Sequence, residues 1–232
     1  MTRDLPVPLG FVGGTGPQGR GLAVRFARVG YPVWVGSRDA AKAQAAVADL
    51  DADGGRLQGA TNLEACEAAD IVFVTVPYEG QQATLPPLAD AIGDKIVVNC
   101  VNALTFDGRG AMPAVVEGGS AAEECQALLP NARVVSAFHD VSARRLLKVS
   151  EPITVDVLIC GDDEDAKHHI AHLAAVIPGM WGVDAGPLRM SAPIEAMTAV
   201  LLAINRRYRI HSGLRIDGIE RTDEGMHAKP RP

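Results

Sequence analysis

Three glycines near the N-terminus have the spacing needed to bind a phosphate. Gly14, Gly16 and Gly19 form the pattern G-x-G-x-x-G between an apolar run and a helix-forming stretch. In that context Gly14 permits a tight turn, Gly16 lets the backbone approach a pyrophosphate, and Gly19 lets the helix pack closely on a sheet. Pro17 suits the first helical position, and the helix N-terminus offers unpaired N–H groups. The pattern predicts a dinucleotide-binding loop; the alternative is a glycine-rich turn without a ligand.

The end of the next expected strand indicates which dinucleotide binds. An NAD-binding fold usually has Asp or Glu there to hold the ribose 2′-hydroxyl, whereas this chain has Ser37 and Arg38. Ser37 can donate a hydrogen bond to a 2′-phosphate, and Arg38 can form a planar fork against it. Lys42, one helical turn after Arg38, adds positive charge, and Asp39 is expected to cap the following helix. The sequence therefore predicts NADP(H) rather than NAD.

A parallel sheet is needed to position these residues, and the rest of the chain has the pattern of one. Short β-branched runs alternate with alanine-rich helical stretches, which is typical of βαβ units. We expect helices at 18–29 and 39–50, and strands at 7–12, 32–35, 71–76, 95–99 and 133–136. A Gly- and Pro-rich stretch at 105–120 is expected to be a long loop. The predicted fold class is α/β, a Rossmann-type doubly wound parallel sheet with a smaller C-terminal α/β domain.

A second block of elements begins near residue 151. We expect a helix from 161 to about 177, an apolar helix at 192–206, and strands at 154–160 and 181–184. The apolar helix is too hydrophobic for a solvated surface, so we expect it between domains or in a homodimer interface. The predicted division is a nucleotide-binding Rossmann domain at 1–150, a smaller domain at 151–220 that completes the cleft and the dimer interface, and a flexible tail at 221–232.

The composition argues against several function classes. The net charge of −6 over 232 residues opposes a nucleic-acid surface acting through bulk charge. No stretch approaches the roughly 18 apolar residues of a membrane span, and the first residues do not resemble a secretory signal. Four widely spaced cysteines are interpreted as reduced and buried: Cys66, Cys100, Cys125 and Cys160. We expect a cytoplasmic protein with no nucleic-acid or membrane partner.

Further motifs give the chain a more specific signature. They are G-G-T-G-x-x-G at 13–19, V-G-S-R at 35–38, V-V-S-A-F-H at 134–139, C-G-D-D at 160–163 and D-A-G-P-L at 184–188. With them the chain resembles the F420-dependent NADP reductases from its first strand to about Ile219. The resemblance implies an oxidoreductase that moves a hydride between C4 of the nicotinamide of NADP(H) and C5 of the deazaflavin of coenzyme F420. No metal or covalent intermediate is implied.

The resemblance also assigns site residues. One group is placed on the 2′-phosphate or near it: Thr15, Ser37, Arg38 and Lys42. Val76 and Pro77, at the end of the 71–76 strand, would flank the nicotinamide. With the glycine loop, the cofactor-binding residues on the NADP(H) side are Gly14, Thr15, Gly16, Pro17, Gln18, Gly19, Ser37, Arg38, Lys42, Val76 and Pro77.

On the F420 side, the loop from Ala137 to Ala143 would cover the hydride-transfer position, and Thr198 would face the deazaflavin. His139 is the titratable residue expected in the cleft, where it could hydrogen-bond the deazaflavin; the alternative is a structural histidine. Because the two cofactors carry the chemistry, no catalytic side chain is required beyond this possible role of His139.

Two features depart from the archaeal members of the family. Ala192 and Ala196 stand where those members carry Arg and Ser, at positions that border the F420 pocket. Basic residues could compensate by meeting the phosphate and polyglutamate tail of F420 from another direction. The candidates are the run 206–209 and the group Arg144, Arg145 and Lys148. For each cluster the alternative is a solvated helix end.

Other titratable clusters favour structural interpretations. His168, His169 and His172 could share a helix face, but no third-ligand pattern completes a metal site, so we expect a solvated face. Acidic residues at 162–165 suit the start of a helix. Glu195, on the apolar helix, is expected to bond a nearby Arg or backbone group. No metal is predicted.

Three functions remain open from the sequence. The leading one is NADPH-dependent reduction of F420, and the reverse reaction, by a homodimer. The second is an NADPH-dependent reductase of another acceptor, a flavin or an imine, which Ala192 and Ala196 favour. The third is a non-catalytic NADP-sensing protein that has the fold without an acceptor pocket.

Overall fold

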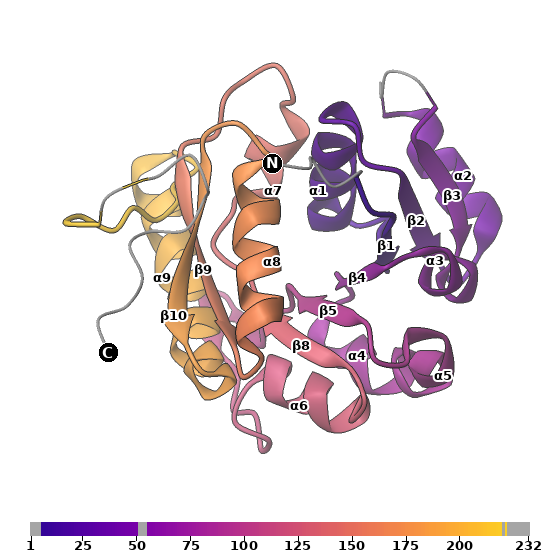
Figure 1. Cartoon of the computed structure of the whole chain (residues 1–232). Helices are drawn as coiled ribbons and strands as arrows, with labels where there is room; N and C mark the ends of the chain where they lie inside the picture. Colours follow the sequence, from indigo (N-terminus) through magenta and orange to yellow (C-terminus); the bar gives the residue numbers. More distant parts are fainter. Residues whose placement is uncertain (1–5, 51–54, 220, 222–232) are drawn as a thin grey trace.

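The structure is a computed structural model, and it describes residues 6–50, 55–219 and 221. A central β-sheet runs through the molecule (Figure 1). The strand order is β10-β9-β8-β5-β4-β1-β2-β3. The strands are β1 Leu9–Val12, β2 Val33–Ser37, β3 Leu57–Thr61, β4 Ile71–Val74, β5 Ile96–Asn99, β8 Arg133–Ser136, β9 Val155–Gly161 and β10 Met180–Gly186. Neighbouring strands pair in parallel, except that β8 and β9 are antiparallel. The predicted doubly wound α/β sheet is confirmed, with one antiparallel pair that was not predicted.

Each face of the sheet carries its own hydrophobic core, because successive side chains of a strand point to opposite faces. Phe11 and Phe73 stack at 4.5 Å between ring centroids on one face. The helices over that face are α1 Pro17–Arg28 and α8 Glu164–Ala175. Val12 and Val74 pack on the other face. The helices there are α3 Asn62–Ala68, α4 Tyr78–Thr84, η1 Pro86–Leu88, α5 Ala89–Ile92 and α6 Ala121–Leu128.

Several elements differ from the expected ones. The stretch expected to be a long loop contains an antiparallel hairpin, β6 Leu104–Asp107 and β7 Gly110–Pro113. The prediction of a loop over the whole stretch was therefore wrong, because the glycines there form a turn between two short strands. The remaining helices are α2 Ala40–Ala48, α7 Ala143–Leu147, η2 Leu188–Met190 and α9 Ser191–Tyr208. Asp39 caps α2 as predicted, accepting a hydrogen bond from Ala41 N at 2.9 Å.

The C-terminal block extends the main sheet. β9 and β10 continue its edge (Figure 1), and one buried cluster contains both Phe11 of β1 and Ile159 of β9. The division at residue 150 stays a prediction. On α9, Ile194 and Ala199 are buried whereas Val200 is exposed. The expected flexible tail at 221–232 lies outside the described residues, apart from Arg221.

Arg25 joins helix α1 to the short helix α7. It is 7% exposed, and its guanidinium donates hydrogen bonds to four backbone carbonyls at 2.8–3.1 Å. Those carbonyls belong to Arg145, Leu146, Lys148 and Glu151. Two of them, on Arg145 and Leu146, lie in the last turn of α7, where carbonyls lack the i+4 donors of a longer helix. Arg25 therefore fixes α7 relative to α1.

The four cysteines are buried and free, as predicted. Burial is the main cause that raises the pKa of each thiol, and the pKa of Cys66 reaches about 12. Such thiols are protonated at neutral pH and act as small apolar side chains. No helix in the part of the chain that the structure describes is long and apolar enough to cross a membrane.

Candidate functional site

The turn after β1 is made by Gly13, whose φ of 69° is left-handed. The sequence assigned this turn to Gly14, which does lie in it, although the left-handed residue is Gly13. Gly14 is required for a different reason, since a Cβ there would lie 2.7 Å from the Cβ of Phe11. A Cβ on Gly13 would lie 2.5 Å from Cγ1 of Val76. Glycine therefore brings the loop close to both β1 and the end of β4.

The start of α1 is open and has backbone N–H groups without intrahelical partners. Pro17 is its first residue, as predicted, and Gly16 is its N-cap. The nearest atom to a Cβ on Gly16 would be 3.9 Å away, so the space before it is open. A Cβ on Gly19 would lie 2.6 Å from the Cα of Gly14, which confirms close packing of helix and loop. Arg20 N donates the first intrahelical bond, to Gly16 O at 2.9 Å, which leaves earlier N–H groups for a phosphate.

Residues distant in sequence hold this loop in place. Asn62, at the start of α3, accepts a hydrogen bond from Gly13 N at 3.0 Å. The hydroxyl of Thr75 donates to Val12 O at 3.0 Å. The sequence analysis missed Asn62. The capping box of Thr61 and Glu64 was the signal that could have placed it at a helix start beside the sheet edge.

A cleft of about 660 Å³, the first cleft, lies where β1 and β4 end. This is the topological switch point at which doubly wound sheets bind ligands. Most residues predicted on the NADP(H) side line it: Thr15, Gly16, Pro17, Gln18, Ser37, Arg38, Lys42, Val76 and Pro77. Gly14 and Gly19 do not line the cleft in the described structure, but they pack against each other beneath the loop. The structure thus brings the predicted residues of one side together.

The cationic groups of the first cleft are free to meet a ligand. Arg38 and Lys42 are exposed, and neither has an ion pair or hydrogen bond within the described residues. Ser37 is 8% exposed, and its hydroxyl oxygen accepts a hydrogen bond from Asp39 N at 3.3 Å. That hydroxyl keeps its own proton to donate. Two unpaired positive groups beside a free donor suit a phosphate.

A second cleft of about 650 Å³ adjoins the first. Gln18 and Asn102 line both clefts, so the two meet there. Three residues predicted on the F420 side line the second cleft: His139, Ala143 and Thr198. Ala137 does not line either cleft in the described structure; it is fully buried, and its N–H donates to Asn99 O at 3.1 Å.

The residues that depart from the archaeal pattern are distributed unevenly. Ala192 and Ala196 line neither cleft of the described structure, contrary to the expectation that they border the F420 pocket. From the basic groups, Arg144, Arg206 and Arg209 do line the second cleft. Lys148 instead pairs with Glu151 at 3.0 Å on the surface, as the solvated-end alternative expects.

A buried hydrogen-bond network lies at the junction of the clefts. His139 Nδ1 lies 3.1 Å from Oδ1 of Asn102, and Nε2 lies 2.7 Å from the hydroxyl of Ser136. Asn102 Nδ2 donates to His139 O at 3.3 Å, so Oδ1 of Asn102 is an acceptor and Nδ1 of His139 carries the proton. Burial lowers the pKa of His139 to about 4. The ring is neutral with both nitrogens engaged, which favours a structural role.

The turn before His139 has an unusual backbone. Phe138 has a φ of 65°, a conformation that costs a non-glycine residue energy and is found mainly at functional sites. Its ring is buried against Phe26 and Phe73, and its carbonyl accepts a hydrogen bond from Gln18 Nε2 at 2.9 Å. Core packing therefore holds the strained turn and aligns it with the glycine loop.

Asp140 is a buried carboxyl group that the sequence analysis missed. It lines the second cleft and is 8% exposed. Thr198 Oγ1 lies 3.2 Å from Asp140 Oδ1, 3.2 Å from Asn102 Oδ1 and 3.3 Å from His139 O. One hydroxyl proton can serve one of these acceptors at a time. Burial raises the pKa of Asp140 to about 6.

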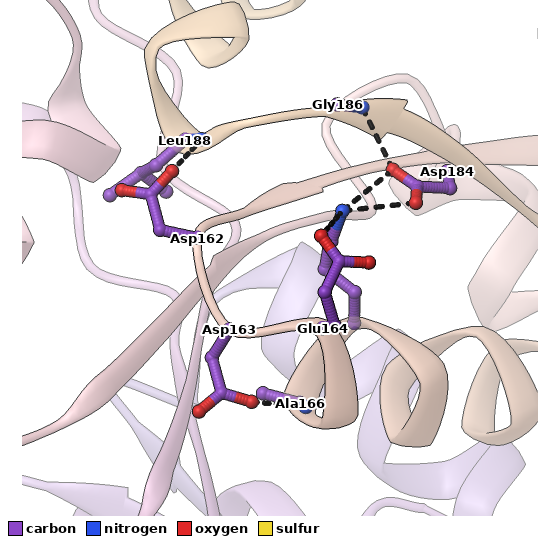
Figure 2. A network of polar contacts seen from close by, with 8 residues as sticks. Asp162, Asp163, Glu164, Ala166, Asp184, Gly186 and Leu188 are labelled. Carbon is purple, nitrogen blue, oxygen red and sulfur yellow. Dashed lines mark hydrogen bonds and ion pairs between the residues drawn. The ribbon is translucent and has the colours of Figure 1, made fainter. Parts of the chain in front are cut away.

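The two later motifs support each other (Figure 2). Asp162 accepts a hydrogen bond from Leu188 N at 2.9 Å, and Asp184 accepts one from Gly186 N at 2.8 Å. Lys167 bridges Asp184 at 3.0 Å and Glu164 at 2.9 Å. These contacts fix the end of β10 to α8, and they fix η2, which leads into α9, to the turn between β9 and α8. The motifs therefore position α9, which forms a wall of the second cleft.

The predicted structural roles of other charged residues are confirmed. Asp163 caps α8 by accepting from Ala166 N at 2.7 Å, and three histidines on α8 are exposed: His168, His169 and His172. Glu195 accepts hydrogen bonds from Ala121 N and Ala122 N at 3.0 and 3.2 Å, which joins α9 to the start of α6. No group of three potential metal ligands occurs within the described residues.

The comparison with known proteins agrees with this geometry. Residues 8–103 match the family model described as NADP oxidoreductase, coenzyme F420-dependent. The F420-dependent NADP reductase of Methanothermobacter thermautotrophicus is 36% identical, over 94% of this chain and 98% of that protein. The chain belongs to the F420-dependent NADP reductase family. The enzyme of that name from Methanocaldococcus jannaschii is 34% identical over 91% of this chain.

A solved structure supports the fold of this family member. A protein from Arthrobacter sp. FB24, provisionally named an F420-dependent NADP reductase, aligns with a TM-score of 0.80 at 22% identity. The alignment covers 90% of this chain and 99% of that chain. Every residue that lines the first cleft falls within the range 8–103 of the family model. For most of the second cleft, the similarity rests on the full-length relatives.

The buried carboxyl group predicts a pH dependence of stability. The folded-state pKa of Asp140 lies above its ordinary value, so its contribution is fully present below about pH 4 and is lost as pH rises through about 6. Asp140→Asn removes this loss. Relative to the unchanged protein, the variant should gain about 2–3 kcal/mol in unfolding free energy between pH 4.5 and 7.5.

Urea unfolding across that pH range measures the effect. Asp217→Asn, at an exposed carboxylate, serves as the matched control and should change the unfolding free energy by less than about 0.5 kcal/mol. A difference between Asp140→Asn and the unchanged protein that does not vary with pH would contradict the raised pKa.

Proposed function

We propose that this protein transfers a hydride between NADP(H) and the deazaflavin of coenzyme F420, in either direction, without a metal or covalent intermediate. The observation that carries the proposal is the shared border of the two clefts at Gln18 and Asn102. Two ligands that occupy adjoining clefts can place their reacting carbons in contact, which is what direct transfer requires. Family membership supports the choice of the two ligands.

The first cleft fits NADP(H) on structural grounds. The space before Gly16 is open, and the first N–H groups of α1 have no intrahelical partner, so a pyrophosphate fits at the helix end. Arg38 and Lys42 would hold the 2′-phosphate, with Ser37 and Thr15 beside it. Val76 and Pro77, which line the same cleft just after β4, would flank the nicotinamide.

The second cleft fits a large ring system with a few polar groups. Its apolar wall comes from Val141, Leu201 and Leu202, and its polar groups near the junction come from Asn102 and Thr198. Thr198 and the backbone of Ala143 would face the deazaflavin. When both ligands are bound, the cofactors themselves supply hydride transfer between nicotinamide C4 and deazaflavin C5.

The protein's task is to position the rings and to exclude water. The left-handed turn at Phe138 and the hydrogen bonds of His139 fix the backbone at the junction of the two clefts. The imidazole of His139 is neutral and both of its nitrogens are hydrogen-bonded, so it supplies no proton to the reaction. Positioning of this kind lowers the barrier without a nucleophile or a base. His139 thus serves as a positioning residue.

We also propose a homodimer, in the cytoplasm, with α9 at the interface. Met190, Met197 and Val200 are 42%, 39% and 52% exposed, and they recur on one face of α9 and the residue before it. Exposed apolar faces of this kind often mark protein interfaces. The buried free thiols are compatible with a reducing compartment.

Removing the guanidinium of Arg38 should weaken the binding of NADPH but not that of NADH. Arg38→Ala should raise the KM for NADPH at least tenfold, because a fork against the 2′-phosphate is lost. The KM for NADH, which lacks that phosphate, should change less than twofold in the same variant. Steady-state kinetics with both nucleotides measure this, and an unchanged KM for NADPH would refute the clamp.

A direct assay tests the proposed reaction. The purified protein is mixed with NADPH and oxidised F420, and loss of the deazaflavin absorbance is followed, with FMN, FAD and a cyclic imine in parallel. We expect turnover with F420 alone. Turnover only with a flavin or an imine would indicate a reductase of another acceptor. NADPH binding without turnover of any acceptor would indicate an NADP-sensing protein.

A charge in the exposed face of α9 should separate the proposed dimer. Val200→Asp should shift the sedimentation coefficient from dimer to monomer at micromolar concentration, because an unpaired carboxylate would be buried in the interface. Val115→Asp, at a residue that is 94% exposed, is the matched control and should leave the dimer intact. A monomeric unchanged protein, or a dimeric Val200→Asp, would refute this interface.

A further inference from the structure

The lining of the second cleft is rich in cationic side chains. Arg144 from α7 and Arg206 and Arg209 from the end of α9 line it, in a chain whose net charge is −6. The acidic residue among its lining side chains is Asp140, which is buried and linked to Thr198 near the junction. Three arginines around a single cleft of an acidic protein indicate a local site for an anion.

The arginines of α9 lie away from the junction of the clefts. Thr198 bonds to Asn102 at the junction, whereas Arg206 and Arg209 follow it by eight and eleven residues. At 1.5 Å per residue these positions lie about 12 and 16 Å further along the helix axis. A ring placed at the junction would therefore leave these arginines to whatever is attached to the ring.

A buried hydroxyl in the same cleft has no partner. Ser212 lines the cleft, and its Oγ is buried without a hydrogen bond in the described structure. Leaving such a group unsatisfied is costly. Its backbone is fixed, because Ser212 N donates to Asn205 Oδ1 at 2.6 Å. Ser212 thus adds an unpaired hydroxyl to the cleft that the arginines line.

The surrounding segment is also held in position. Arg206 Nη1 donates to Arg109 O of the β6–β7 hairpin at 2.7 Å, which orients the guanidinium. Arg209 has a left-handed φ of 55° and ends α9. Beyond it the chain returns to the sheet, where Asp156 N donates to Leu214 O at 2.9 Å. A guanidinium that is held before binding, as that of Arg206 is, loses little entropy when an anion arrives.

We propose that Arg144, Arg206, Arg209 and Ser212, the cationic wall, bind the anionic tail of the deazaflavin cofactor. This inference rests on the proposed function. The tail is a phosphodiester followed by carboxylates, joined to the ring by a sugar-alcohol chain, and arginine forks suit both kinds of anion. The ring then binds at the junction while the charge of the tail is recognised at the far end of α9.

Binding of two ligands that differ only in the tail tests the proposal. One is oxidised F420, and the other is the same deazaflavin ending at its ribityl chain. Fluorescence titrations without NADPH give both Kd values for the unchanged protein and for Arg206→Gln/Arg209→Asn, in which Asn tolerates the left-handed backbone. The double variant should bind F420 at least tenfold more weakly and the tailless ligand within twofold. Added salt should weaken F420 binding less in the variant.

Arg207→Gln is the matched control, because Arg207 is exposed on the same helix and lies outside the described lining of the cleft. It should leave both Kd values unchanged, and NADPH affinity reports on folding in every variant. Equal weakening of both ligands, or an unchanged Kd for F420 in the double variant, would overturn the cationic wall. Ser212→Ala should weaken F420 binding a further threefold or more, and equal effects on the tailless ligand would remove Ser212 from the site.

The test separates failure of the wall from failure of the proposed function. If the double variant behaves as the unchanged protein while NADPH reduces both deazaflavins, only the cationic wall is wrong. If neither deazaflavin binds or is reduced by the unchanged protein, the proposed function itself is wrong, and the wall falls with it.

Discussion

The arrangement of the two clefts depends on the side-chain amide of Asn102. Its Oδ1 lies 3.1 Å from His139 Nδ1 and 3.2 Å from Thr198 Oγ1, and its Nδ2 donates to His139 O. One partly buried amide therefore joins the segment after β5, the turn after β8 and the helix α9. Since buried polar groups must be satisfied, these elements can adopt few relative positions. The border at which two ligands would meet is set by this amide.

The rest of the fold supports that junction from several directions. Arg25 holds α7 through four carbonyls, and Glu195 holds α9 to the start of α6. Asp162 fixes the chain that leads into α9. The packing of the Phe138 ring in the aromatic core offsets the cost of its left-handed backbone. A site that only positions two ligands needs this rigidity more than it needs reactive side chains.

Local signals explain which features the sequence could predict. The glycine loop, the Ser37–Arg38 pair and the cap at Asp39 depend on neighbouring residues, and their roles were predicted, although the left-handed turn is at Gly13. Asn62 and Asn102 act through contacts 49 and 96 residues away in the chain, which no local pattern specifies. β3 is short and contains Gln58 and Gly59, so its apolar pattern is weak and the sequence analysis did not predict this strand. Nor does a strand's composition reveal its direction, which left the antiparallel pairing of β9 unpredicted.

Transfer of an isotopic label tests the meeting of the two clefts most directly. NADPH deuterated at one face of C4 is incubated with oxidised F420 and the protein in ordinary water, and the reduced deazaflavin is analysed by mass spectrometry and NMR. Clefts that adjoin at Asn102 predict that deuterium from a single face arrives at C5 without exchange. Loss of the deuterium to the solvent would contradict direct transfer between rings held at this junction. So would equal delivery of deuterium from the two forms of NADPH that are labelled at opposite faces of C4.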